Sequence, residues 1–323
     1  MENRSQALEI IGDAELLVKK IGGTQAADVA GNLARTKTHS AEQDIVISAI
    51  RTEEFNTTSH LISAAEAISR CDRSKAGREL VTVKNFFHEA IRQLFDDNEA
   101  VHERFQAELT EFRAQLLAAL HAGETIQQNG SDWSYKNFSI TGFGEILTAA
   151  LYETYFEDQE VDMSTVRIHP GYRPDLAHLR GYTDLHAAHI AKDHADAGRN
   201  PVLFIEKECA LREADPREVP TAAVIPAIDR TLTTALCTSE EGPQAKLLHP
   251  GVLPLLADTD IQIVIGNPDR LETEGTTVTQ TRTPNVVVRA DTFVISHQEV
   301  PHTIATGTQG LRRRQTQSLA IAA

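Results

Sequence analysis

The chain has 323 residues, enough for one large domain or two ordinary ones with a substantial core. Its 31 Lys and Arg residues are outnumbered by 46 Asp and Glu residues, and the resulting net charge of −15 disfavours nucleic acid and anionic membrane surfaces as partners. An anionic small-molecule substrate would therefore need a locally positive site.

The three cysteines, Cys71, Cys209 and Cys237, are widely spaced and include no Cys-x-x-Cys pair. This pattern argues against a disulfide framework or a zinc site and fits a reducing compartment. The first ten residues lack a signal-peptide pattern, and no apolar run approaches membrane-spanning length. We expect a soluble, cytoplasmic protein with no membrane or nucleic-acid partner.

Short apolar strands alternate with helical segments in the first part of the chain. Residues 15–23 are typical of a buried strand and 24–41 of a helix, and a second strand and helix are expected at 43–50 and 60–70. This β-α-β-α order predicts a parallel sheet with right-handed crossovers.

The segment 80–121 interrupts this alternation. Its apolar residues recur at i, i+3, i+4 and i+7, which predicts two amphipathic helices separated near residues 96–98. We expect a helical hairpin packed on the sheet, and we assign it no chemistry.

The second half of the chain returns to alternating strands and helices. The expected elements are a turn and helix at 138–156, a strand at 165–174, a helix at 184–194, a strand at 201–208, a helix at 244–259 and a strand at 261–266. A last short strand is expected at 285–296, followed by a polar, flexible tail.

A Gly-Gly turn after the first strand is the first candidate site. Gly22 and Gly23 would let the backbone approach an anion closely, and the N-terminus of a following helix would offer N–H groups and a partial positive charge. Lys20 adds a full positive charge. The combination suits nucleotide phosphates, although a Gly pair at a strand end is also common as a simple turn.

Other polar residues lie at strand or turn ends, where open parallel sheets bind ligands. Ser48 ends the second strand, Glu145 opens a helix, Arg180 and Asp184 lie in a loop that enters a helix, and Lys246 follows later. Each has a structural alternative: Glu145 as a first-turn carboxylate, Asp184 as an N-cap, Arg180 in a surface ion pair and Lys246 as a solvated helix residue.

Taken in chain order, these segments resemble the amino-acid kinase family, and within it the aspartokinases. The resemblance runs from about residue 15 to 278. The matching segments are 20–24 (KIGGT), 46–50 (VISAI), 143–149 (FGEILTA), 180–184 (RGYTD), 214–217 and 224–226 (ADPR and VIP), 244–250 (QAKLLHP) and 261–278. The resemblance implies a dimer with a three-layer α/β/α amino-acid kinase fold over residues 1–283, a mainly parallel central sheet and an inserted helical hairpin.

The resemblance also implies ATP-dependent phosphorylation of the side-chain carboxylate of an acidic amino acid, most simply L-aspartate to 4-phospho-L-aspartate, with Mg²⁺. Glu145 would hold the substrate ammonium group, and Arg180 a substrate carboxylate. The implied catalytic residues are Lys20, Asp184 and Lys246. The implied nucleotide-binding residues are Gly22, Gly23, Glu206, Glu208 and Lys246, and the implied substrate-binding residues are Thr24, Ser48, Glu145, Arg180 and Thr183.

The chain departs from the family pattern at several places. Ile146 replaces an Arg, Tyr182 replaces a Gly, the loop between Pro170 and Arg180 is short, and residues 205–211 (IEKECAL) lack the Gly and Tyr of the nucleotide-binding stretch. Two alternatives therefore stay open: a pseudokinase or amino-acid-binding regulatory module, and a kinase repurposed for another acidic substrate. The residues after 278 are too few for the tandem ACT domains of aspartokinases, so we expect no ACT feedback regulation.

Overall fold

The computed structural model describes residues 6–95, 98–107, 109–111, 114, 140, 142–172, 182–212, 221–238, 248–280, 287–290 and 293–296. The chain divides into two compact units. One unit is Val18–Ala187, and the other combines Met1–Leu17 with Ala188–Ala323. No helix within the described residues is long and apolar enough to cross a membrane.

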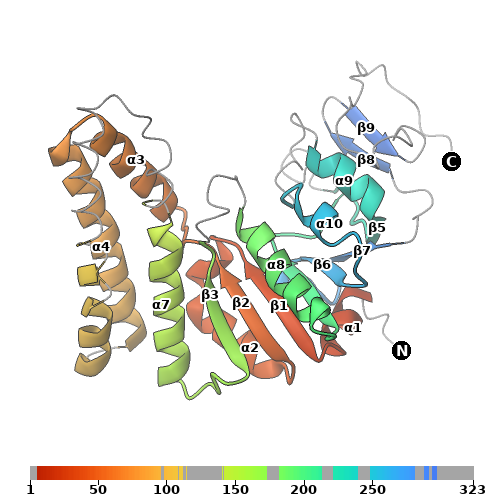
Figure 1. The fold of residues 1–323 in the computed structure, drawn as a ribbon, viewed down its shortest axis with the longest axis horizontal. Helices are drawn as coiled ribbons and strands as arrows, with labels where there is room; N and C mark the ends of the chain where they lie inside the picture. The colour runs from red at the N-terminus through yellow and green to blue at the C-terminus, as the bar shows by residue number, and fades with distance from the viewer. Residues whose placement is uncertain are drawn as a thin grey trace. The chain divides into compact units, whose positions relative to one another are not determined.

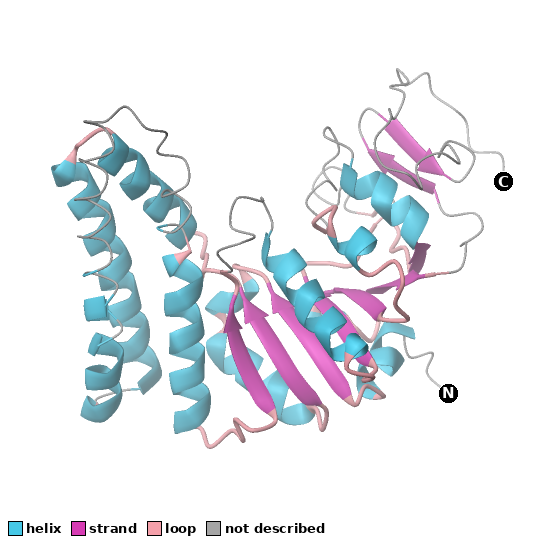
Figure 2. Ribbon diagram, in the orientation of Figure 1, coloured by secondary structure: helices cyan, strands magenta, loops and turns pink. Residues whose placement is uncertain are grey.

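Seven strands form a mainly parallel sheet, ordered β3-β2-β1-β4-β6-β7-β5, which confirms the expected α/β class (Figure 1, Figure 2). The pairs β2/β3, β4/β6 and β5/β7 are parallel, and β6/β7 is antiparallel. Every residue of β1 and β4, two inner strands of the sheet, is buried, as expected for strands covered on both faces. The strands of the sheet are β1 (Leu16–Ile21), β2 (Glu42–Ile47), β3 (Val166–Pro170), β4 (Pro201–Glu206), β5 (Ala227–Asp229), β6 (Gln262–Gly266) and β7 (Gly275–Thr279).

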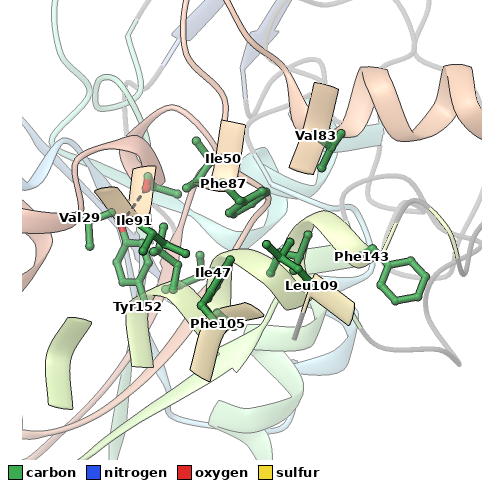
Figure 3. Close-up of a cluster of buried hydrophobic side chains, with 14 of the residues drawn as sticks. Val29, Ile47, Ile50, Val83, Phe87, Ile91, Phe105, Leu109, Phe143 and Tyr152 are labelled. Atoms are coloured by element: carbon green, nitrogen blue, oxygen red, sulfur yellow. Dashed lines mark hydrogen bonds between the residues drawn. The ribbon is translucent and has the colours of Figure 1, made fainter. Parts of the chain in front are cut away.

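In the unit Val18–Ala187, helices pack on β1, β2 and β3. One face of these strands carries Ile45, Ile47 and Ile168, which belong to a single apolar core with the helices (Figure 3). The helical elements of this unit are η1 (Gln25–Ala27), α2 (Val29–Thr38), α3 (Thr57–Ser69), α4 (Arg73–Phe95), α7 (Phe143–Asp158) and the start of α8 (Tyr182–Asp196).

The opposite face of β2 and β3 carries charge. Arg167 donates through Nε and Nη2 to the two carboxylate oxygens of Asp44, both at 2.8 Å, and His169 Nε2 lies 2.7 Å from Asp44 Oδ1. Asp44 and Arg167 are partners in the parallel register of β2 and β3, so this ion pair joins the edge strand to its neighbour.

The helical hairpin begins earlier than the sequence pattern predicted. α4 starts at Arg73 instead of residue 80 because the apolar face extends back to the buried Ala76. The chain is helical again over 99–107, where Phe105 packs against Phe87 with ring centroids 6.2 Å apart. The expected break includes residues 96 and 97, which lie outside the described residues.

One polar side chain ties α7 to α2 inside this core. Tyr152, labelled in Figure 3, is fully buried. Its hydroxyl accepts a hydrogen bond from Asn32 Nδ2 at 2.7 Å and donates one to the Ala26 carbonyl at 3.0 Å. Both bonds satisfy groups that would otherwise be buried without water, as close-packed interiors require.

The unit of Met1–Leu17 and Ala188–Ala323 contains α1 (Gln6–Gly12), α9 (Arg230–Thr238), α10 (Val252–Leu255) and η3 (Pro268–Arg270) around its strands. The sequence pattern predicted neither α1 nor α9. α1 packs closely on β7, and Gly275 leaves room for this contact. A Cβ at position 275 would lie only 2.3 Å from Ala7 Cβ.

Two expectations about this unit were wrong. The helix expected at 244–259 is a single turn, α10, within the described residues 248–259, since Pro250 and Pro254 each lack a backbone donor. The single strand expected at 285–296 is an antiparallel pair, β8 (Val287–Ala290) and β9 (Phe293–Ser296), in which Ala290 faces Phe293. Asp291, a residue that favours turns, separates them in the sequence. The expected tail, 297–323, lies outside the described residues.

We expect Tyr152→Phe to lower the free energy of unfolding by about 1–3 kcal/mol, because two buried hydrogen bonds are lost without loss of volume. Urea denaturation would measure the change. Tyr155→Phe, on the same helix but partly buried, is the matched control and should change stability by less than about 0.5 kcal/mol. Equal effects of the two substitutions would contradict this role for Tyr152.

Candidate active site

The carboxyl ends of β1, β2 and β3 meet at one edge of the sheet in the unit Val18–Ala187. The Ser48 amide donates to the Ile21 carbonyl at 3.1 Å, and the Gly171 amide donates to the Ile47 carbonyl at 2.7 Å. The segments that leave the three strands therefore lie side by side. Ligands of open parallel sheets bind at this edge.

A buried ion pair lies at this edge. Lys20, near the end of β1, places Nζ 3.1 Å from Oδ1 of Asp184, and the two side chains are only 8% and 7% exposed. Asp184 lies within the first turn of α8, not before the helix. The helix dipole favours a carboxylate in this first turn. Two of the three predicted catalytic residues are thus in contact.

The Gly-Gly turn is held against the segment that follows β2. The Arg51 amide donates to the Gly23 carbonyl at 2.9 Å, and a Cβ on Gly23 would lie 2.7 Å from the Ala49 carbonyl oxygen. A side chain at position 23 would therefore displace this segment. The contact also brings the exposed Arg51 beside the turn, a cation that the sequence analysis missed.

The expectation that a helix N-terminus directly follows this turn was wrong. A single 3-10 turn, η1, comes first, and α2 begins only at Val29. Asp28 caps α2, since its carboxylate accepts from the Gly31 amide at 3.0 Å. The Asp28 carboxylate thus occupies one of the free amides that a phosphate at this helix N-terminus would bind.

Glu145 is a buried carboxylate in the first turn of α7, with 6% of its surface exposed. Its carboxylate accepts hydrogen bonds from the Tyr182 hydroxyl and from the backbone amides of Ala49 and Glu145 itself. Oε2 has no hydrogen-bond partner among the residues that the structure describes. Burial outweighs these donors and raises the pKa of Glu145 to about 7.

Small residues allow the surrounding backbone to close over Glu145. A Cβ on Gly171 would lie 2.6 Å from the Ile47 carbonyl oxygen, 2.8 Å from Thr183 Cγ2 and 3.1 Å from Glu145 Cγ. The Pro-Gly pair after β3 indicated only a loop, so the sequence analysis did not assign Gly171 to the site. Its role depends on contacts between segments far apart in the chain.

Thr148 fixes α7 to the segment after β2. Its hydroxyl donates to the Gly144 carbonyl at 2.7 Å and accepts from the Ile50 amide at 3.2 Å. A Cβ on Gly144 would lie 2.7 Å from Ala49 Cβ. These contacts set the position from which Glu145 reaches the Ala49 amide.

The structure thus brings together Lys20, Glu145, Thr183 and Asp184, with Ser48 partly buried beside them. Thr24 is exposed after the turn. Arg180 and Lys246 lie outside the described residues.

Glu206 and Glu208 belong to the other unit. Glu206 is fully buried at the end of β4, whereas Glu208 is exposed in the following turn, where its carbonyl accepts from Asn267 Nδ2 at 3.1 Å. The two carboxylates therefore lie in different environments.

No protein-family model and no curated protein sequence matches the chain. Solved structures do match it. Escherichia coli aspartokinase III in complex with lysine and aspartate (T-state) is 18% identical, with a TM-score of 0.60 over 84% of this chain and 66% of that chain. The same enzyme with aspartate and ADP (R-state) is 18% identical, with a TM-score of 0.61 over 84% and 65%.

Clostridium acetobutylicum aspartate kinase is 15% identical, with a TM-score of 0.55 over 85% of this chain and 66% of that chain. This chain thus spans just under two thirds of the length of the chains it matches. At these identities the likeness establishes the fold, which is that of the aspartokinases.

The buried ion pair leads to a prediction about stability. Lys20→Met or Asp184→Leu alone should lower the free energy of unfolding by about 3–5 kcal/mol, because each leaves one buried charge without its partner. The double variant should lose clearly less free energy of unfolding than the two single variants lose together, which a double-mutant cycle measured by urea denaturation would show. The more exposed Lys192–Asp196 pair of α8, 2.8 Å apart with side chains 32% and 60% exposed, is the control and should couple by about 0–1 kcal/mol. Equal coupling in the two cycles would contradict the burial of Lys20 and Asp184.

The pKa of Glu145 leads to a prediction about pH. Because this pKa rises from 4.5 to about 7 on folding, the folded chain holds the proton more tightly than the unfolded chain between these values. The contribution of Glu145 to stability therefore falls as pH rises from 4.5 to 7, by about 3 kcal/mol in total. Glu145→Gln should match the wild type near pH 4.5 and be the more stable protein at pH 8, measured by urea denaturation. A difference between the two proteins that does not change with pH would refute the shift.

Proposed function

We propose that this protein is an ATP-dependent kinase that phosphorylates the side-chain carboxylate of an acidic amino acid, with L-aspartate as the first candidate. The observation that carries the proposal is the convergence of Lys20, Asp184 and Glu145 at one strand edge of an aspartokinase-type fold. One of the matching structures holds aspartate and ADP.

The proposed reaction asks little covalent chemistry of the protein. A carboxylate oxygen of the amino acid attacks the γ-phosphorus of ATP in line, the bond to the β,γ-bridging oxygen breaks, and ADP leaves. The products are an acyl phosphate and ADP. Catalysis then consists of positioning the two substrates and balancing the charge of the transferring phosphoryl group.

Lys20 would supply positive charge to the phosphates. In the structure its ammonium group is balanced by Asp184, so a nucleotide would share this cation with a buried carboxylate. Asp184 would thereby hold Lys20 in place. Lys246 is proposed as a further cation, and Gly22, Gly23, Glu206 and Glu208 as the remaining nucleotide-binding residues.

Glu145 would bind the α-ammonium group of the amino acid. A buried acceptor without a hydrogen bond is costly, and an ammonium donor at Oε2 would remove this cost. A neighbouring cation also favours the charged carboxylate, so ammonium binding and ionisation of Glu145 support each other. We propose Thr24, Ser48, Arg180 and Thr183 as the other substrate-binding residues, and a homodimer as the assembly.

A Mg²⁺ ion is expected with ATP, where phosphate oxygens and water supply most of its ligands. The described part of the chain contains no group of three His, Cys, Asp or Glu side chains placed to hold a metal ion. We therefore assign no metal ligands among the described residues and no step of the reaction to the ion.

One observation favours a second candidate, an amino-acid-binding module without kinase activity. Residues 205–211 depart from the nucleotide-binding stretch that the aspartokinase resemblance implies, and Glu206 and Glu208 lie in different environments, one buried and one exposed. Such a protein would keep the Glu145 site and lose affinity for ATP.

Hydroxylamine trapping of the acyl phosphate tests the proposal. Purified protein with ATP·Mg²⁺ and L-aspartate should give a hydroxamate and an equal amount of ADP. Lys20→Ala should lower the rate at least about 100-fold, as expected for loss of a charge at the transferring group. Lys192→Ala, a substitution of a partly exposed lysine in α8, is the control, and circular dichroism would show that each variant is folded.

The outcomes separate the two candidates. A hydroxamate that depends on Lys20 supports the kinase. Aspartate binding by calorimetry without ATP binding or hydroxamate would favour the binding module, and a protein that binds neither ligand would refute both.

A further inference from the structure

Tyr182 stands where the aspartokinase resemblance implies a glycine, and it contacts Glu145. It is the first residue of α8, and its hydroxyl donates to the Glu145 carboxylate. Because Glu145 lies in the first turn of α7, this hydrogen bond joins the N-terminal turns of two helices.

The ring of Tyr182 is partly buried and has an aromatic neighbour. Tyr172 packs edge-on against it, with centroids 6.4 Å apart and an interplanar angle of 82°. Gly142, just before α7, makes room for Tyr172, because a Cβ there would lie 2.0 Å from Tyr172 Cδ2. Two aromatic rings thus pack between the start of α7 and the start of α8, with Glu145 at one of them.

The ionisation of the two groups fixes the direction of the hydrogen bond. Burial, followed by the negative charge of Glu145, raises the pKa of Tyr182, so the phenol stays protonated and donates. The Tyr182 hydroxyl and the two backbone amides supply donors to the carboxylate, and Oε2 has no partner among the described residues.

We infer that Tyr182 determines which amines this site accepts: its hydroxyl holds the Glu145 carboxylate so that Oε2 faces one ammonium group, and its ring restricts the space around that group to a primary α-amine. The inference rests on the proposed function and deepens it. N-acylation would remove the positive charge that Glu145 requires, and N-methylation would add bulk beside the ring.

Two substitutions separate the hydroxyl from the ring. Tyr182→Phe removes the donor and keeps the ring, so it should lower kcat/KM for L-aspartate about tenfold and keep the preference for the primary amine. Tyr182→Gly removes both. It should reduce the ratio of kcat/KM for L-aspartate to kcat/KM for N-methyl-L-aspartate at least about tenfold, the discrimination that exclusion of one methyl group usually gives.

The kinetic test compares kcat/KM for these two amines in the wild type and both variants. Tyr155→Phe, which removes a tyrosine hydroxyl elsewhere in the same unit, is the control and should leave both values unchanged. Tyr182→Phe is nearly isosteric, so it should fold even if Tyr182→Gly does not.

A readout that needs no turnover is the titration of Glu145. The infrared band of its protonated carboxyl group can be assigned as the band lost in Glu145→Gln. In Tyr182→Phe the carboxylate loses a donor to its charged form, so the pKa of Glu145 should rise and the band should persist to higher pH. Tyr155→Phe should leave the band where it is.

The outcomes distinguish this inference from the proposed function. Aspartate phosphorylation with the same amine preference in Tyr182→Gly, or with the same Glu145 titration in Tyr182→Phe, would overturn the inference and leave the kinase assignment in place. Absence of binding of both amines to the wild type, measured by calorimetry, would overturn both.

Discussion

The desolvation of charge at one edge of the sheet is the constraint on which the candidate site depends. Three charged groups, Lys20, Glu145 and Asp184, are removed from water within a few residues of the ends of β1 and the starts of α7 and α8. A buried charge is tolerated only if it is paired, hydrogen-bonded or neutralised by a proton. Lys20 and Asp184 are paired with each other, whereas Glu145 is hydrogen-bonded and is neutralised by a proton below its raised pKa.

The balance of positive and negative charge among these buried groups also indicates which ligand groups the site can bind. Lys20 is offset by Asp184, and Glu145 adds a negative charge when ionised, so the described buried charges suit an ammonium group better than a phosphate. Arg51 brings a cation beside Gly23. In a chain with a net charge of −15, we propose that Arg180 and Lys246 supply further positive charge for phosphate and carboxylate binding.

The sequence predicts five of the seven strands of the sheet because the signal of those five is local, and it misses β5 and β7. A run such as that of β4 is buried throughout, and an apolar run bounded by turn residues is enough to place it. The wrong helix predictions also have local causes, which the pattern of apolar residues does not show. α2 begins after its N-cap Asp28 instead of directly after Gly23, and two prolines limit the length of α10. The β8/β9 pair was missed because the apolar residues continue on both sides of Asp291 in the sequence.

The site was predictable in part. Lys20, Glu145 and Asp184 lie at strand and helix ends, so their types and positions indicated them. Their contacts were not predictable, since Glu145 and Tyr182 are 37 positions apart in the sequence and no local pattern shows that the two meet. The same holds for Gly171, whose importance comes from the three backbone and side-chain groups around it.

A crystal structure of the protein with L-aspartate and a non-hydrolysable ATP analogue would show whether Lys20 and Glu145 bind the two substrates. We expect the substrate ammonium group within hydrogen-bonding distance of Glu145 Oε2, and a phosphate oxygen beside Lys20 Nζ. An aspartate bound with its ammonium group away from Glu145, or a nucleotide bound away from Lys20, would contradict this expectation.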